Sequence, residues 1–561
     1  MTLMTALSAA VSGLRTTQAG IANVSQNISN ADSAGYTKRR IQPIEQVAGD
    51  RSAGVRTGEV QRVLDRAVQR QLWQENSGAG YTGLRAGLSG ALERLYGPPG
   101  SPSALDTLLN QFSSAIGSLN DDPASTTARS AVIGAGQTLA SRINTIGQGV
   151  QALRTETEGR IATMVDEANG LLSSIERVNT AILTSGATAP LADERDRLIG
   201  QLSALVDIQV QPAQSGSVSI LTGAGQTLFD GVRALRLGFD ARSTLSPQTR
   251  YDTTPPSVGV LTLVSPSGLE TDLVASGAIR SGAIAAAIEM RDETLVTAQR
   301  QLDELAVGLA RGMSETPIDT APSAGGVVLS SRPPAAANTV SFPVALDLLV
   351  GGVATRIDAP DAATLTGAVA ALGGGASYTA GTRELALPAN AVFVGASNPG
   401  LAGGPGFDFF TDASAPYTGA GDQLTGFAQR IRVGATITPA SLQNGALAGD
   451  PARAQQMRDA LERPQAVSGA AGLSGSAAFS GSVGDIVRRT VEVQGADAAM
   501  SARLDEGQRV ALAAVEGRFA QTSGVNIDEE MAQLVQLQTA YGANARVLSA
   551  VREMMDVLLR I

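Results

Sequence analysis

Two stripes of apolar residues with a strict seven-residue repeat mark the opposite ends of this chain. The repeat comprises Leu7, Leu14, Ile21 and Ile28 near the N-terminus and Ile527, Leu534, Tyr541, Leu548 and Met555 near the C-terminus. Such a repeat keeps one stripe of a helix facing a partner through left-handed supercoiling. We therefore predict that a helix over 3–28 packs on a helix over 526–561 as a coiled-coil-like pair. Two ordinary amphipathic helices within one core remain the alternative.

The C-terminal stripe is wider than one partner helix requires. Its heptads carry apolar residues at three positions, among them Met531, Leu537, Ala545 and Val551. A stripe of this width indicates further neighbours, either other domains or other subunits. On this stripe we expect Tyr541 to bury its ring and to hydrogen-bond a partner through its hydroxyl group.

Between the two ends, helical and strand-like patterns succeed one another. A helical period covers blocks near 57–95, 103–119, 124–184, 191–205, 281–316, 450–463 and 476–520. Residues 206–275 alternate with a period of two, and residues 320–447 are rich in Ala, Gly, Pro and Thr with short apolar runs. The 124–184 block would span roughly 90 Å as one helix, although its six glycines could bend it.

These patterns predict an α+β multidomain fold in which β-rich domains are inserted into a long helical rod domain. We expect four parts: the terminal helices (1–40 plus 521–561), the helical rod domain (41–205 plus 281–319 plus 448–520), a β-rich domain (206–280) and a β-rich insertion (320–447). The insertion is bounded by Gly- and Pro-rich segments that adjoin helical framework on both sides. We therefore expect it to project outward, with its two ends close together.

The composition excludes most catalytic chemistry. The 561 residues include no His, no Cys and a single lysine, Lys38. A Ser-His-Asp or Cys-His nucleophile, a Cys/His zinc site and a disulfide therefore cannot form. The Gly-rich sequence GAGYTG at 78–83 follows a helical rather than a strand-like segment, so it predicts a helix interruption and not a dinucleotide site. We expect no enzymatic activity, no cofactor and no bound metal.

Charge and hydropathy exclude two further classes of protein. The net charge of −10 and the pI near 4.9 argue against a nucleic-acid binder, which needs a basic stripe against the phosphates. We interpret the basic triplet 38–40 as a solvated or inter-subunit face. The run Asp-Glu-Arg-Asp-Arg at 193–197 is interpreted as the solvated start of a helix with local ion pairs. No stretch reads as a membrane span, and the N-terminus lacks the pattern of a signal peptide.

An asparagine-rich break ends the N-terminal helix. In NVSQNISNADSAGYTKRR (23–40), Asn23, Asn27 and Asn30 fall at i, i+4 and i+7, and therefore on one helix face. Their amides could fix the register between helices of neighbouring subunits, as a buried Asn does in coiled coils, or they could form a solvated face. Gly35 is expected to supply a positive φ angle for the turn before Tyr36.

The same stretch resembles the N-terminal signature of the axial proteins of the bacterial flagellum, the family of rod, hook and hook-associated proteins. The stretch LVQLQTAYGANARVLSAVREMMDVLL (534–559), which includes Gln538, is similar to the C-terminal signature of that family. Two internal stretches, at 190–210 and 281–310, resemble the hook-associated members that join the hook to the filament. The Asp-Ser-Ala turn at 32–34 departs from the family, which often has Asn, Thr and Pro there.

The resemblance implies a structural adaptor that self-assembles at the distal end of the hook and joins it to the filament. Its terminal helices would form an inner tube, and its β-rich parts would face outward. It further implies export through the flagellar type III pathway and an extracellular location. The implied partners are other copies of the chain, the hook protein, a second junction protein with flagellin beyond it, and an export chaperone on the C-terminal helix. The assembly interface would consist of the two heptad stripes with Asn23, Asn27, Asn30, Gly35, Tyr36 and Gln538.

Two other classes of function remain open. One is a secreted adhesin or binding module displayed on a helical stalk through residues 320–447, which glycan or surface binding by that insert would favour. The other is a carboxylate hydrolase in the same insert, which would need a cleft with a pair of acidic residues. Neither nucleic-acid binding nor membrane insertion is expected.

Overall fold

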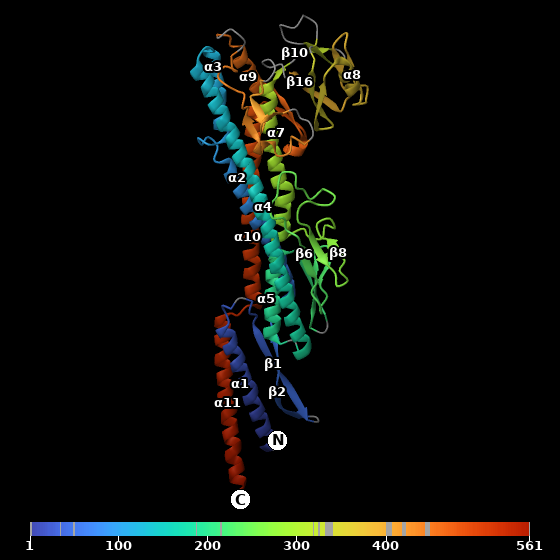
Figure 1. Cartoon of the computed structure of the whole chain (residues 1–561). Coiled ribbons are helices and arrows are strands. Elements are labelled where there is room, and N and C mark those ends of the chain that lie inside the picture. Colours follow the sequence, from blue (N-terminus) through green and yellow to red (C-terminus); the bar gives the residue numbers. More distant parts are fainter. Residues whose placement is uncertain are drawn as a thin grey trace.

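The computed structural model is elongated, with both chain termini at one end (Figure 1). A helical rod occupies the middle, one β-rich part lies along its side, and another lies at the end far from the termini. The α+β multidomain fold predicted from the sequence is confirmed. The structure describes residues 3–33, 35–48, 51–186, 188–213, 216–317, 319–323, 326–330, 340, 342–399, 407–417, 422–443 and 449–559.

The rod domain is built from helices that run along the long axis of the molecule (Figure 1). They are α2 (Arg66–Tyr96), α3 (Leu105–Asp121), α4 (Thr126–Ser185), α5 (Ala189–Leu205), α6 (Ala283–Glu289), α7 (Leu295–Ser314), α9 (Ala452–Glu462) and α10 (Val483–Ser523). Local capping sets their starts. The Asp65 side chain accepts hydrogen bonds from the first turn of α2, and Ser482 and Asp485 form a capping box at the start of α10.

Helix α4 is continuous over 60 residues in spite of its six glycines. Two of these glycines permit close packing. A Cβ atom added at Gly136 would lie 2.6 Å from the ring of Phe409, and one at Gly149 would lie 2.8 Å from Leu95. These glycines are therefore contact sites for neighbouring elements and not breaks in the helix.

The helix interruption predicted at 78–83 is wrong, because α2 runs through these residues without a break. A Cβ atom at Gly78 would lie 2.6 Å from Gln508 of α10, and one at Gly80 would lie 2.1 Å from the carbonyl oxygen of Ala204. The glycines of GAGYTG thus let α10 and the end of α5 approach the backbone of α2.

The β-rich part over residues 208–272 consists of two three-stranded antiparallel sheets. Strands β3 (Ile208–Pro212), β4 (Val218–Thr222) and β5 (Thr227–Phe229) form the first, and β6 (Arg236–Phe239), β7 (Leu261–Val264) and β8 (Glu270–Asp272) form the second. Buried apolar residues of both sheets, such as Ile220 and Leu263, share one core with Leu172 of α4 and Leu202 of α5. This part is therefore packed on the rod and is not a free module.

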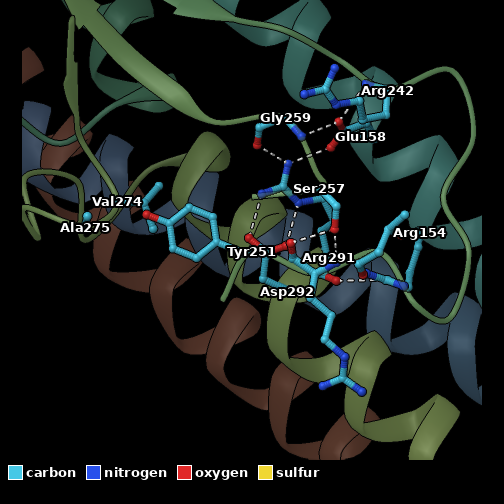
Figure 2. A network of polar contacts seen from close by, with 12 residues as sticks. Arg154, Glu158, Arg242, Tyr251, Ser257, Gly259, Val274, Ala275, Arg291 and Asp292 are labelled. Atoms are coloured by element: carbon cyan, nitrogen blue, oxygen red, sulfur yellow. Dashed lines mark hydrogen bonds and ion pairs between the residues drawn. The ribbon is translucent and has the colours of Figure 1, made fainter. Parts of the chain in front are cut away.

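A buried ion-pair network joins this β-rich part to the rod (Figure 2). A π-helical turn, Met290–Thr294, connects α6 to α7 and carries Arg291, whose side chain is only 1% exposed. The Arg291 guanidinium lies 2.5 Å from Glu158 of α4 and 2.6 Å from Asp292. It also donates to the carbonyl oxygen of Gly259, which precedes β7, at 2.8 Å.

Arg154 of α4 extends this network toward the loop between β6 and β7. It donates to the carbonyl oxygens of Ser246 at 3.1 Å, Thr249 at 2.9 Å and Arg291 at 3.1 Å. Burial lowers the pKa of Arg154 to about 10. Charged side chains that bind backbone carbonyls therefore hold the loop against α4. Figure 2 shows the neighbouring contact of Arg291 with Gly259.

A separate small domain follows α7. Its first sheet has the order β13-β12-β16-β9 and its second the order β10-β11-β15-β14. The elements are β9 (Glu315–Pro317), β10 (Asp319–Ser323), β11 (Gly326–Ser330), β12 (Val344–Val350), β13 (Val353–Ala359), α8 (Ala362–Ala370), β14 (Ser377–Thr379), β15 (Glu384–Ala386) and β16 (Ala391–Pro399). They enclose a core of their own, which includes Leu346, Leu365 and Leu385. Pro317 stands opposite Ser397 in the sheet, so the domain begins and ends at neighbouring positions.

The predicted insertion 320–447 is too long, because its last part belongs to the rod. Residues 407–443, with β17 (Phe410–Asp412), β18 (Ala415–Pro416), the 3-10 turn Phe427–Gln429 and β19 (Ile431–Val433), pack into the rod core. The rings of Phe409 and Phe410 are fully buried, 5.6 and 5.7 Å from the ring of Phe112 on α3.

The buried carboxylate of Asp303 on α7 fastens this segment to the rod. It accepts hydrogen bonds from the backbone N–H groups of Gly426 at 2.8 Å and Ala428 at 2.9 Å. Short elements near the same end of the rod complete the domain: β20 (Gln465–Val467), the 3-10 turn Gly469–Ala471, β21 (Leu473–Ser476) and β22 (Phe479–Gly481).

An antiparallel hairpin, β1 (Arg39–Ala48) and β2 (Arg51–Arg62), precedes the rod. The sequence placed the rod domain from residue 41 and a helical block from residue 57, and both boundaries are wrong. The register shifts twice along the hairpin, so its apolar positions do not keep a strict period of two. This irregularity explains why the sequence pattern does not reveal the strands.

Candidate assembly interface

Helices α1 (Leu3–Ser29) and α11 (Ile527–Leu559) lie side by side and antiparallel at the end of the molecule that carries both termini (Figure 1). The predicted packing of the N-terminal helix on the C-terminal helix is confirmed. The contact is close because small residues of α1 face α11. A Cβ atom added at Gly13 would lie 3.1 Å from Asn544, and one at Gly20 would lie 3.2 Å from Leu537.

The residues of α1 that are buried are not the large apolar residues of the predicted heptad stripe. Ala10, Thr17 and Val24 are 4%, 7% and 1% exposed, and they recur every seven residues beside Gly13 and Gly20. The predicted residues Leu7, Leu14, Ile21 and Ile28 are only half-buried. The heptad stripe therefore flanks the contact between the helices instead of forming its centre.

The same displacement holds on α11. Leu534, Leu548 and Met555 are half-buried, while Ile527, Gln538 and Tyr541 are exposed. Tyr541 is 43% exposed in the single chain, so the burial of its ring stays a prediction for the assembly. No described element of the same chain covers this side of α11, so the residue stands free of the core.

Two of the three predicted asparagines join α1 to other elements of the chain. Asn27 is fully buried and donates to the carbonyl oxygen of Arg39 at 2.9 Å and to the Glu530 carboxylate at 2.9 Å. Its own side-chain oxygen accepts from the Tyr36 hydroxyl at 2.9 Å and from the backbone N–H of Arg39 at 3.1 Å. Asn23 also donates to the Arg39 carbonyl oxygen, at 2.8 Å.

This placement corrects the interpretation of Asn23 and Asn27 as a solvated face, because both side chains are buried and hold the start of β1 against α1. The side-chain oxygen of Asn23 has no hydrogen-bond partner among the described residues, and a role of the stripe between subunits stays a prediction. Asn30 stands apart from them. Its side chain donates to the Gln26 carbonyl oxygen at the exposed end of the helix.

The Gly-Tyr turn brings the chain back to α1. Gly35 has φ of 81°, which confirms the predicted positive angle. The Tyr36 hydroxyl donates to Asn27, and the Arg39 guanidinium lies 4.5 Å above the centre of the Tyr36 ring. Burial raises the pKa of Tyr36, so the phenol keeps the proton that it donates. Ala34, which belongs to the predicted departure from the family pattern, lies outside the described residues.

Lys38 joins the hairpin to the connection between α10 (Val483–Ser523) and α11 (Ile527–Leu559), which we call the elbow. Its Nζ lies 2.9 Å from Glu529 and 3.2 Å from Glu530. Its backbone N–H donates to the Ser523 carbonyl oxygen at 2.8 Å, and the Ser523 hydroxyl accepts from the backbone N–H of Asp65 at 3.1 Å. Burial opposes the charged form of Lys38, but hydrogen bonds to the two glutamates outweigh it and raise the pKa of the amine.

The acidic start of α5 completes this elbow. The local ion pairs predicted for 193–197 are present, since Arg197 lies 2.7 Å from Glu194, but the interpretation of the whole run as solvated is wrong for its two aspartates. Asp193 is 7% exposed and pairs with Arg39 at 3.1 Å and Arg62 at 2.8 Å. Asp196 pairs with Arg62 at 2.6 Å and accepts from Gln69 at 2.9 Å. The triplet 38–40, interpreted as a solvated or inter-subunit face, is likewise bound within the chain through its first two residues.

Sequence reasoning missed this set of polar residues, which we call the elbow network: Lys38, Arg39, Arg62, Asp193, Asp196, Ser523 and Glu530. In the sequence, each of these residues reads as an ordinary solvated polar or charged side chain. The available signal was charge complementarity between the basic ends of the hairpin and two acidic segments. Nothing in the sequence showed that these segments meet.

Among the residues that the structure describes, there is no group of three or more acidic side chains placed to hold a metal ion. Over the same residues, every helix is too short or too polar to cross a membrane.

Comparison with known proteins identifies relatives over the whole chain. Residues 90–317 match the family model described as "Flagellar hook-associated protein FlgK helical domain", and residues 517–561 match "Flagellar basal body rod FlgEFG protein C-terminal". The flagellar hook-associated protein 1 of Escherichia coli is 24% identical over 98% of this chain and 98% of its own length. That of Bacillus subtilis is 28% identical over 37% of this chain and 44% of its own length.

Two further comparisons are partial. The flagellar hook-associated protein 1 of Salmonella typhimurium is 27% identical over 41% of this chain, so the match spans less than half of that relative, as it does for the Bacillus protein. The solved structure of the flagellar hook junction protein FlgK from Burkholderia pseudomallei aligns with a TM-score of 0.40 and 18% identity, over 70% of this chain and 66% of that one.

Proposed function

We propose, from the premise that this chain belongs to the family of flagellar hook-associated protein 1, that it assembles at the distal end of the hook and joins the hook to the filament. The relatives are hook-associated proteins of the flagellum, and this chain has the same structural role among the hook-associated components. The junction itself is the part that we propose.

The observation that carries the proposal is the distribution of exposed apolar side chains. Ten of the eighteen exposed large hydrophobic residues of the described chain lie on the hairpin and on α11. They are Ile44, Val47 and Val60 of the hairpin and Ile527, Met531, Val535, Tyr541, Val547, Met554 and Val557 of α11. Exposed apolar side chains that gather on one part of a protein mark a protein–protein interface.

This distribution supports assembly through the terminal helices. In the proposed junction, α1 and α11 of successive copies pack around a common axis as an inner tube, and the β-rich parts face outward. A subunit of such a layer must hold its tube helices at a fixed angle to its rod. The elbow network supports this requirement, because ion pairs at 2.6–3.1 Å tie the hairpin to α5.

The proposed mechanism is mechanical. One face of the assembled layer matches the lattice of the hook protein, and the other matches a second junction protein with flagellin beyond it. The layer separates two lattices of different geometry, so that the mismatch between them does not spread into either. Before assembly, an export chaperone covers the apolar residues of α11, and the chain leaves the cell through the flagellar type III pathway to its extracellular site.

Location tests this proposal directly. Antibodies against the domain over residues 319–399, applied to whole cells and detected with gold particles, should label one narrow band at the boundary between hook and filament. The matched control is a strain in which that domain is removed from the chain. Label along the filament, or over the cell body, would contradict a junction role.

A further inference from the structure

The heptad stripes of α1 and α11 lie on the same side of the helix pair. At about 100° per residue, Leu7, Leu14 and Ile21 project roughly 110° away from the side of α1 on which Gly13 and Gly20 meet α11. On α11, Ile527, Leu534 and Tyr541 project roughly 70° away from the side on which Leu537 and Asn544 meet α1, and the sense of rotation is the same when each helix is viewed from its own N-terminus.

Because the two helices are antiparallel (Figure 1), the heptad residues of α1 and those of α11 project to the same side of the helix pair. We call the surface formed there by Leu7, Leu14, Ile21, Ile527, Leu534 and Tyr541 the apolar face. Its residues are half-buried or exposed in the single chain. The face is continuous with the α1–α11 contact, and no described element of the same chain lies over it.

The β1–β2 hairpin lies on the opposite side of α1. Ser12 accepts a hydrogen bond from the backbone N–H of Val55 at 3.2 Å, and Asn23 donates to the Arg39 carbonyl oxygen at 2.8 Å. On a helical wheel both residues project roughly 170° away from Leu14. The helix pair therefore has the hairpin on one side and the apolar face on the other.

The hairpin exposes apolar surface of its own. Ile44, Val47 and Val60 are 41%, 65% and 46% exposed. A two-stranded hairpin is at best marginally stable in water unless it packs on something, and within this chain it packs mainly on α1. The hairpin thus offers a second apolar surface, which lies on the side of the helix pair opposite to the apolar face.

We propose that the apolar face receives the β1–β2 hairpin of a second copy of this chain. The two surfaces differ and lie on opposite sides of the helix pair, so their contact is head-to-tail. Repetition of such a contact builds a closed ring or a helical layer, whereas a patch that binds itself builds only two-fold dimers. This inference rests on the proposed assembly and specifies which surfaces make it.

Cysteine cross-linking tests the contact with little background, because the natural chain has no Cys. The variants combine Val60→Cys with Ile527→Cys, Leu534→Cys or Tyr541→Cys. The three α11 positions sample the axial offset between copies in steps of about 10 Å. The matched control combines Val60→Cys with Gln536→Cys, an exposed position on the opposite side of α11. Each variant is the sole copy of the chain in its strain, and flagella are oxidised before electrophoresis without reductant.

The expected result is a ladder of dimers, trimers and larger multiples for one of the three pairs, and monomer alone for the Gln536→Cys control. A cross-linked dimer without trimers or larger multiples would overturn the head-to-tail contact. Monomer alone for all three pairs in swimming cells would also overturn it. That outcome would leave the proposed junction intact, because swimming reports the junction independently of the cross-link.

Discussion

Asn27 and Glu530 are 503 residues apart in the chain, and a buried hydrogen bond of 2.9 Å joins them. Both side chains are fully buried, and Lys38 supplies the charge that pairs with the carboxylate. The bond places the end of α1 against the first turn of α11. It also ties that contact to the hairpin, because Asn27 binds the backbone of Arg39 as well. The side-chain amide of Asn27 therefore connects α1 with both the hairpin and α11.

Replacement of Asn27 by Ala should loosen α1 while the rod stays folded. The variant loses the donor to Glu530 and removes the acceptor of the Tyr36 hydroxyl and of the Arg39 backbone N–H. Unsatisfied buried groups cost about 1–3 kcal/mol, so amide hydrogen exchange of residues 3–33 should become faster by the corresponding factor. The control is Asn30→Ala, which removes only exposed hydrogen bonds, to Gln26 and from Ser33. Equal exchange rates in the two variants would show that the buried amide is not needed.

Replacement of Tyr541 by Asp should block assembly without lowering the melting temperature of the single chain. The residue is 43% exposed in the monomer, so a carboxylate there is solvated before assembly. Between packed subunits the same carboxylate would be buried without a partner, and this penalty recurs in every copy. The measurement pairs a swimming assay with a melting curve, and Gln536→Asp on the opposite side of α11 is the control. Normal swimming of the Tyr541→Asp strain would remove this face from the assembly.

Deletion of residues 318–396, bridged by Gly-Ser, should leave a chain that is exported and supports filaments of normal length. Pro317 and Ser397 face each other across the sheet, which places their Cα atoms about 5 Å apart. Deletion of residues 407–443 should instead abolish folding of the rod, because it removes Phe409, Phe410 and Phe427 from the core. Filament counts by electron microscopy, with export measured in the medium, distinguish the two. Bare hooks in spite of export of the first variant would give the domain a part in the junction.

The free energy of unfolding should decrease as the pH rises from about 4.5 to 7. Burial raises the pKa of Glu304 on α7 from 4.5 to about 7, with smaller opposing effects of Arg311 and Arg300. The folded state therefore keeps a proton in this window that the unfolded state has lost, and this stability is fully present only below about pH 4.5. Glu304 alone contributes at most about 1.4 kcal/mol of this decrease for each pH unit. Asp303, whose burial raises its pKa to about 6, acts in the same direction.

The test compares melting temperatures at pH 5 and pH 8. The Glu304→Gln variant should show a smaller decrease between the two pH values than the natural chain, because its side chain does not ionise. Glu506→Gln, at an exposed position of α10, is the control and should retain the full decrease. An unchanged decrease in the Glu304→Gln variant would assign the pH dependence to other groups.

The sequence predicted the terminal helix pair because a heptad repeat is a local signal that survives without any knowledge of the partner. It did not predict which stripe forms the contact. Large residues such as Leu14 dominate a periodicity analysis, whereas the close contact of α1 with α11 requires small ones such as Gly13 and Thr17. The short distance between the two helices selects the stripe of small residues, and sequence periodicity does not report that distance.

The elbow network could not be predicted for a different reason. Asp193 and Arg62 are 131 positions apart, and each lies in a segment that reads as an ordinary solvated surface. Segment 407–443 was misplaced because Phe409 and Phe410 sit among Gly and Ala residues, so their stretch resembled the preceding insert in composition. Tertiary contacts of this kind leave no periodic trace in either segment.

The most direct test of the junction itself is an electron micrograph of cells from which the gene for this chain has been deleted. The account predicts hooks of normal length without filaments, with flagellin free in the medium, and restoration of filaments by the natural chain. Filaments attached to hooks in the deleted strain would contradict the account, because no adaptor would then be needed between the two lattices.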